Sequence, residues 1–204
     1  MATLRLVGIA AALLAMQADA HAQRPRDTAA ASVEYLGGEF LQGFAWSGVG
    51  LVSIGTGIVL VTRDDEVAKG ASYPVLGVGA IQLGAGIVSF ISPPRRAARN
   101  AVLIAADHDG FLRDEGKRIR RVNTAFRVLA ITELALVVGG VATAVIGHAK
   151  DAPTAEGVGI GLASEAAVMY VLDHFAHRRA ERYAARLSAR ADTTGFVVGL
   201  SGVL

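Results

Sequence analysis

The sequence predicts an all-α integral membrane protein in which four apolar helices form a bundle. Of the 204 residues, 52% are hydrophobic and 19% are charged, which is below the roughly 25% that is typical of soluble domains. The apolar residues are gathered into four runs that approach the length of about 20 residues needed to cross a bilayer. The lipid bilayer is therefore the predicted surroundings of most of the chain.

Four segments have the composition of membrane spans. They are residues 40–62, 70–94, 128–149 and 157–172. The first two contain no charged residue, whereas the third contains Glu133 and the fourth contains Glu165. Short polar linkers at residues 63–69 and 148–156 would join the spans into two helical hairpins.

The first 22 residues have the three parts of a secretory signal peptide. Arg5 supplies the positive start, and residues 6–16 form an apolar core that is too short for a membrane span. Small residues stand at the first and third positions of Ala20–Ala22, as signal cleavage requires. We predict cleavage before Gln23, with cleavage two residues earlier as the alternative.

The rest of the chain is predicted to consist of two related halves. The predicted units are a short N-terminal segment (23–39), a first hairpin with an amphipathic helical loop (40–124), a second hairpin with an amphipathic helix (125–191) and a tail (192–204). A Gly-Val-Gly sequence begins at Gly77 and again at Gly157, and each is followed by an apolar stretch and then Arg-Arg-Ala. This alignment sets Gln82 against Glu165 and predicts a tandem repeat of parallel copies.

The long loop between the second and third spans is predicted to contain two helices. Pro93 and Pro94 suit the start of the first helix, and the sequence Asp-His-Asp-Gly at 107–110 would end it. The second helix would follow from Phe111, lie on the membrane surface and run into the third span, because its apolar residues fall near one face. The tail, residues 192–204, is predicted to be extended or poorly ordered.

The distribution of charge gives two opposite predictions of orientation. Thirteen basic residues lie in the loop 93–124 and in the segment 178–190, whereas the short linkers hold three. Because basic residues favour the cytoplasmic side, this bias places the loop and the tail in the cytoplasm. A cleaved signal peptide followed by four spans places them outside. A short anchor with its N-terminus outside, a segment that fails to cross, or location in another envelope membrane would each remove the conflict.

The composition favours a protein of the bacterial cell envelope. Arginine strongly outnumbers lysine and alanine is frequent, which is typical of a GC-rich bacterial genome. With the signal peptide, this predicts a multi-pass envelope protein, in the inner membrane by preference and in the outer membrane as the alternative. The absence of cysteine excludes disulfides and thiol catalysis. The arginines flank apolar segments, so we predict no nucleic-acid partner.

Glu133 and Glu165 are the strongest functional candidates, and Gln82 is a further polar candidate within a span. An ionisable residue at the centre of a span costs about 2.5 kcal/mol or more, and such residues are functional candidates for that reason. If the two carboxyls faced each other, they would share or relay a proton. The preferred interpretation is that each one is protonated or bonded to Gln82, Thr132, Ser164 or another helix, and holds the bundle together.

Asp173, His174 and His177 form a weaker candidate group at the end of the fourth span. Asp173 and His177 are four residues apart and share a helix face. A metal site would need His108 or His148 as a further ligand. The preferred interpretation is a polar helix end at the level of the lipid headgroups, so we predict no metal, no cofactor and no catalytic residue.

Small residues recur at spacings of four within the spans, as in Ala80 with Gly84 and Gly157 with Gly161. Such spacing lets helices approach closely in a membrane. We therefore predict a non-enzymatic structural or interaction protein that packs against a second copy or another membrane protein. The alternative is a proton- or solute-coupled transport element that uses Glu133 and Glu165. A membrane enzyme with a histidine–aspartate metal site is the third hypothesis.

Overall fold

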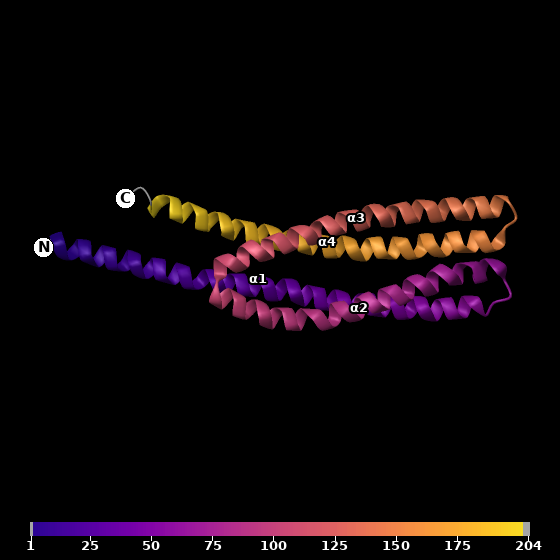
Figure 1. Ribbon diagram of the computed structural model, residues 1–204, viewed down its shortest axis with the longest axis horizontal. Coiled ribbons are helices and arrows are strands. Elements are labelled where there is room, and N and C mark those ends of the chain that lie inside the picture. The colour runs from indigo at the N-terminus through magenta and orange to yellow at the C-terminus, as the bar shows by residue number, and fades with distance from the viewer. Residues whose placement is uncertain (1, 202–204) are drawn as a thin grey trace.

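A computed structural model of the chain consists of long α-helices joined by short connections (Figure 1). The helices are α1 (Ala2–Val61), α2 (Glu66–Ala106), α3 (His108–Ala149) and α4 (Pro153–Ser201). The structure describes the backbone of residues 2–201 and the side chains of residues 24–190. That part of the chain contains no strand, and the predicted all-α four-helix bundle is confirmed.

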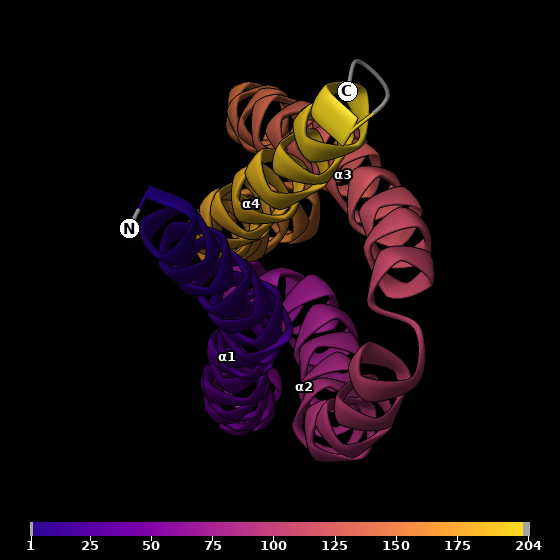
Figure 2. The same cartoon turned by 90° about the vertical axis from the view of Figure 1, so that its left-hand side faces the viewer.

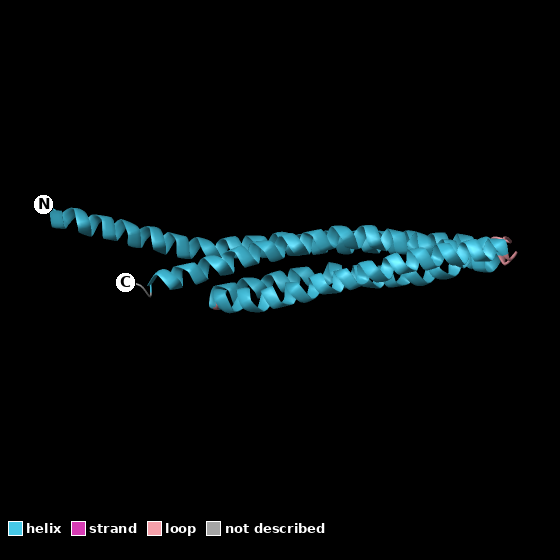
Figure 3. Ribbon diagram, turned by 90° about the horizontal axis from the view of Figure 1, so that it is seen from above, coloured by secondary structure: helices cyan, strands magenta, loops and turns pink. Residues whose placement is uncertain are grey.

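The helices are arranged as two antiparallel pairs that lie side by side. α1 packs along α2, α3 packs along α4, and the two pairs meet where α2 packs against α4. The connections at 62–65 and 150–152 lie together at one end of the molecule, as Figure 3 shows. Asp107 joins α2 to α3 at the opposite end, where these two helices stand apart (Figure 2).

Aspartates stand at each of the three connections. The side chain of Asp65 accepts hydrogen bonds from the backbone N–H groups of Val67 and Ala68, at 2.7 and 3.1 Å, and so caps the start of α2. The side chain of Asp107 accepts one from Gly110 at 2.8 Å at the start of α3. Asp151 has a φ of 52°, a left-handed conformation that aspartate tolerates better than most residues.

Each helix contains a stretch that is long and apolar enough to cross a membrane. Within these stretches, between 11% and 28% of the residues are buried inside the protein, so most of the apolar side chains face outward. Such an outward face fits lipid rather than water. The structure therefore supports a multi-pass membrane protein in contact with the bilayer.

The helices are longer than a membrane is thick. α2 has 41 residues, or about 60 Å at the rise of an α-helix, which is about twice the hydrocarbon thickness of a bilayer. The remaining length forms what we call the polar extension, which comprises residues 24–39, 95–106, 108–127 and 173–190. The extension has its own buried cluster, consisting of Ala31, Tyr35, Leu36, Leu112, Ile119, Ala180, Tyr183 and Leu187.

The loop between the second and third spans differs from the prediction. The predicted break falls at Asp107, but Pro93 and Pro94 do not begin a helix, because α2 continues through both of them. Pro93 is almost fully buried, so packing outweighs the backbone hydrogen bond that proline cannot donate. Residues 111–126 run into the third span as one helix, α3, as predicted, and they contribute Ile119 to the core of the extension.

The C-terminal tail differs from its prediction, and the predicted signal peptide at the N-terminus stays untested. The tail was predicted to be extended or poorly ordered, whereas α4 continues as a helix to Ser201. Residues 182–192 are rich in alanine and arginine and contain no proline. This helical preference outweighs the loose strand-like alternation of apolar residues at Phe196, Val198 and Leu200. The side chains of the predicted signal peptide, residues 1–22, lie outside the described ones, and its cleavage stays a prediction.

Candidate functional site

Glycines line the three principal contacts between the membrane-spanning parts of the helices. A Cβ atom at any of these positions would overlap or press against the facing helix. They are Gly43, Gly50, Gly79 and Gly86 between α1 and α2, Gly140, Gly147 and Gly159 between α3 and α4, and Gly70, Gly157 and Gly161 between α2 and α4. Close approach of backbones provides dispersion contacts that lipid cannot replace.

Other glycines of the spans face open space. A Cβ atom at Gly48, Gly55, Gly77, Gly84 or Gly139 would meet nothing within 4 Å. The predicted rows of small residues therefore divide into two kinds. Gly157 and Gly161 face α2, whereas Ala80 and Gly84 face outward.

Gln82 and Glu165 meet at the contact between α2 and α4. Gln82 is completely buried, and its Nε2 donates a hydrogen bond to Oε2 of Glu165 at 3.0 Å. The hydroxyl of Ser53 on α1 donates a longer hydrogen bond, 3.5 Å, to Oε1 of Gln82. Three helices are thus connected through one buried amide.

This contact joins the two positions that the predicted repeat aligns with each other. α2 and α4 run in the same direction, as the corresponding helices of two parallel copies would. Equivalent residues of two copies lie close together when they are next to the axis that relates the copies. The hydrogen bond between Gln82 and Glu165 agrees with such an arrangement.

Glu133 lies at a different contact, between α3 and α4. Its side chain is 1% exposed, and neither of its carboxyl oxygens has a hydrogen-bond partner among the described residues. The group that acts on it electrostatically is the carboxyl of Asp173 on α4, which is also buried. Glu133 and Glu165 therefore have separate partners.

The side chains offered as alternative partners for the two glutamates bond elsewhere. The hydroxyl of Thr132 donates to the carbonyl of Val128 at 3.0 Å. The hydroxyl of Ser164 donates to the carbonyl of Ile160 at 2.8 Å. Both bonds stay within one helix turn, so of the predicted partners only Gln82 binds a glutamate.

The histidines are distributed along the whole length of the bundle. His148 lies beside Glu156 at the end with the short connections, whereas Nε2 of His108 is 2.9 Å from the hydroxyl of Thr28 at the other end. His177 stacks on Phe126 with ring centroids 5.7 Å apart, and His174 is exposed. Among the described residues, no three potential ligands come together as a metal site would need.

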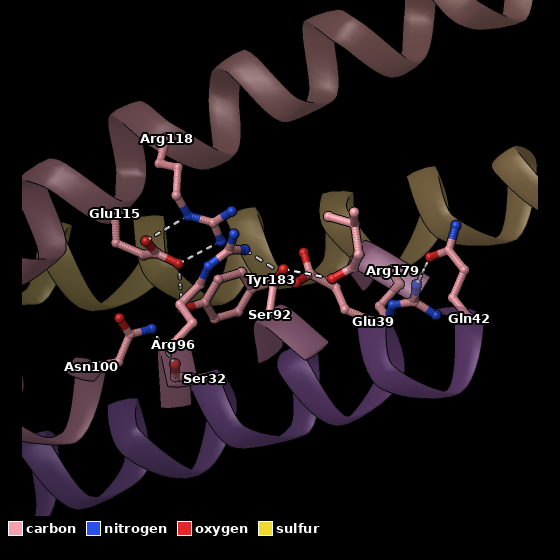
Figure 4. A network of polar contacts seen from close by, with 11 residues as sticks. Ser32, Glu39, Gln42, Ser92, Arg96, Asn100, Glu115, Arg118, Arg179 and Tyr183 are labelled. Carbon is pink, nitrogen blue, oxygen red and sulfur yellow. Dashed lines mark hydrogen bonds and ion pairs between the residues drawn. The ribbon is translucent and has the colours of Figure 1, made fainter. Parts of the chain in front are cut away.

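The polar extension contains a buried network that the sequence did not predict (Figure 4). The rings of Tyr35 and Tyr183 stack with centroids 4.4 Å apart. The hydroxyl of Tyr183 donates to Glu115 at 3.2 Å, and Arg118 donates two hydrogen bonds to the same carboxylate at 2.7 and 2.8 Å. The Arg118 guanidinium also lies 5.6 Å from the centre of the Tyr35 ring.

The charge states of Tyr35, Tyr183 and Arg118 are fixed at ordinary pH. Burial raises the pKa of both tyrosines above the usual range, so both phenols remain neutral. Burial opposes the charge on Arg118, but the hydrogen bonds and negative charge of Glu115 outweigh it and raise the pKa of the guanidinium. These three side chains therefore keep their charge states while they connect the helices.

Further polar contacts connect α1 to the other helices of the extension. Asn100 donates to the hydroxyl of Ser32 at 2.9 Å, and Arg96 pairs with Glu39 at 3.1 Å. Arg179 donates to Gln42, and Arg186 pairs with Glu34. One sequence signal could have identified the buried face of α1, because Thr28, Ala31, Ser32, Tyr35, Leu36 and Glu39 recur at helical spacing.

A hollow of about 410 Å³ opens between the ends of α2 and α3, near Asp107. Its charged lining residues are Arg96, Arg99, Asp107, Asp114, Glu115 and Arg118. Because three arginines and three acids line it, the hollow has no single sign of charge that would select an anion or a cation.

No match to this chain was found among protein-family models, curated proteins or solved structures. The arrangement of its own residues is accordingly the basis for a functional proposal.

Proposed function

We propose that the protein is a non-catalytic membrane scaffold, which anchors the polar extension to a bilayer and presents it in a fixed orientation. The observation that carries this proposal is the use of buried polar groups as connections between helices. Gln82 connects three helices in the spans, and Glu115 connects α3 to α4 in the extension. A polar side chain that is saturated by its neighbours is poorly placed to bind a substrate.

Continuity of the helices supports the same proposal. α2, α3 and α4 each run from a membrane-spanning stretch into the extension as one helix, and so does α1. The extension is therefore built on the same rigid elements as the spans, without a connecting loop. A scaffold needs this property, because a partner bound to the extension then keeps a fixed position relative to the lipid.

The proposed partner is a second copy of the chain or another membrane protein. Outward-facing small residues would provide the contact, with Ala80 and Gly84 on α2 as one face and Gly139 and Thr143 on α3 as another. As part of the same proposal, the protein is bacterial and belongs to the cell envelope, by preference to its inner membrane. The predicted signal peptide and the excess of arginine over lysine support this placement and origin.

Proton- or solute-coupled transport is less well supported, because Glu133 and Glu165 lie at different helix contacts. A flux assay on vesicles that contain the purified protein would separate the two functions. Under the scaffold proposal, Glu165→Gln leaves the flux at the level of empty vesicles, as the unaltered protein does. Flux that depends on Glu165 would replace the scaffold with a transporter.

Two leucine substitutions on glycines test the scaffold and its partner face. Gly84→Leu is expected to keep the helix content and thermal stability of the protein while weakening association between copies, or with a co-purifying membrane protein, by about tenfold. Gly161→Leu fills a contact between α2 and α4 and is expected to destabilise the bundle itself. Cross-linking in native membranes and light scattering in detergent measure association. Unchanged association of the Gly84→Leu protein would contradict the proposed face.

A further inference from the structure

Glu133 and Asp173 are two carboxylic acids that face each other across the contact between α3 and α4. Glu133 is 1% exposed and Asp173 is 8% exposed. The two groups act on each other electrostatically, and both oxygens of Glu133 are buried without a hydrogen-bond donor among the described residues. A buried carboxyl oxygen needs such a donor, because burial removes the water that would otherwise provide it.

No basic group in the part of the chain with described side chains compensates for the charge of the pair. Among the described residues, the charged group that acts on either carboxyl is the other member of the pair. α1 has no ionisable side chain between Glu39 and Arg63, and α2 has only Tyr73 between Lys69 and Arg95. The two helices that pack beside α3 and α4 thus bring no cation to this level.

The ionisable neighbours on α3 and α4 are directed elsewhere. Arg127 lies six residues before Glu133 and is exposed. On α4, His177 stacks on Phe126 and lies 3.5 Å from Glu181, whereas His174 is exposed beside Tyr170. Two full negative charges would therefore face each other in a poorly solvated contact without a counter-ion.

We propose that Glu133 and Asp173 form a buried proton-binding site, where the spans meet the polar extension, that holds one proton between them at neutral pH. One carboxyl keeps its O–H and donates it to a carboxylate oxygen of the other. This single proton supplies the donor that Glu133 lacks and halves the negative charge of the pair. The site goes beyond the proposed scaffold, because it gives the contact between α3 and α4 a bound ligand that solution pH controls.

Loss of the shared proton would have a structural effect. With both carboxyls ionised, α3 and α4 would repel each other at this level, and water would enter to solvate the charges. The contact between α2 and α4 at Gln82 is separate and would remain. The proton therefore regulates one helix contact of the bundle and leaves the other unchanged.

Infrared spectroscopy of the full-length protein in lipid vesicles tests the proposal, because protonated and ionised carboxyl groups absorb at different frequencies. The spectrum is followed from acidic to mildly alkaline pH. We expect one protonated carboxyl to persist at neutral pH, well above the values near 4 at which exposed Asp and Glu ionise. Asp173→Asn removes the repelling neighbour, and we expect it to lower the midpoint for Glu133 by about one pH unit or more.

Matched variants identify the origin of the signal. Glu133→Gln is expected to lower the midpoint for Asp173 in the same way, and the double variant is expected to lose the band. Glu165→Gln is the control, because Glu165 is bonded to Gln82, and we expect the midpoint of the pair to stay unchanged. Glutamate and aspartate labelled with ¹³C shift the band in the unaltered protein, so this assignment does not depend on a variant that folds.

Three results would overturn the proposal. They are full ionisation of the pair at neutral pH, a midpoint for Glu133 that Asp173→Asn does not move, and a neutral-pH band that neither isotope shifts. Addition of sodium chloride in excess provides a further check. We expect no change in the band, and its loss with sodium would assign the pair to a metal cation instead.

Discussion

The membrane-spanning half and the polar extension hold the same four helices together by different means. In the spans, glycines bring helix backbones into contact and apolar side chains face outward. In the extension, large side chains such as Tyr35, Ile119 and Tyr183 are buried in a core, and charged residues lie around it. The solvent explains the difference, because burial of apolar surface favours association in water but not in lipid.

The largest expected effect comes from deletion of an extension core side chain. Ile119 is 1% exposed, so Ile119→Ala should lower the free energy of unfolding of the extension by about 3 kcal/mol. Hydrogen exchange should then accelerate in the extension more than in the spans. Ile131→Ala on the same helix is the control, because Ile131 is 72% exposed and faces lipid. Equal destabilisation by both variants would mean that the two halves are not packed differently.

A smaller effect is expected from adding one methyl group between the spans. Gly157→Ala places a Cβ against the backbone of Val67 and should cost about 2 kcal/mol of stability in detergent, measured by thermal unfolding. Gly77→Ala, at the aligned position of the predicted repeat, meets open space and should be neutral or slightly stabilising. If Gly77→Ala were the more damaging of the two, the glycine contacts would not determine stability.

Removal of the buried amide should have a moderate effect on the spans. Gln82→Leu leaves Glu165 without its hydrogen-bond donor and should cost about 1 kcal/mol, which is typical of polar contacts between membrane helices. The measurement is the thermal midpoint of the protein in detergent. Ser164→Ala provides the comparison, because that hydroxyl bonds only its own helix. If the Gln82→Leu protein were as stable as the Ser164→Ala protein, the buried amide would not contribute to helix association.

The smallest effect concerns the surface of the extension. The hydrogen bond from Arg186 lowers the pKa of Glu34 from its ordinary value of 4.5. A carboxyl with a lowered pKa in the folded state adds stability above its unfolded value, and that stability is lost as pH falls through the folded value. The melting temperature of the extension should therefore decrease on acidification, less so in high salt. Arg186→Ala should flatten this dependence, and a slope that survives the substitution would exclude the pair as its cause.

The spans and their connections were predictable because long apolar runs and capping aspartates are local signals. Gln82 was predicted as a polar position that could bond a span glutamate, and it does bond Glu165. The core of the extension was not predictable in the same way. Tyr35, Glu115 and Tyr183 come from three distant segments, and no local pattern shows that they meet.

The partner of Glu133 was missed for a related reason. Asp173 stands at the end of an apolar run, and position alone favours the headgroup region for an acid there. The helix continues past it, so Asp173 becomes a buried residue between two helices. The prediction at Pro93 and Pro94 was wrong for the same reason. Like Asp173, the two prolines suggest a helix boundary at a place where the helix continues.

Because the helices are unbroken, the extension projects from the spans as a rigid unit. Residues 173–190 of α4 correspond to about 27 Å of helix beyond the last span. A partner that binds the far end of the extension would be held at this distance from the spans, independently of the lipid composition. A change in the distance or tilt of the extension relative to the bilayer would require all four helices to bend together. The number of residues in the helices therefore sets the distance of the extension from the bilayer.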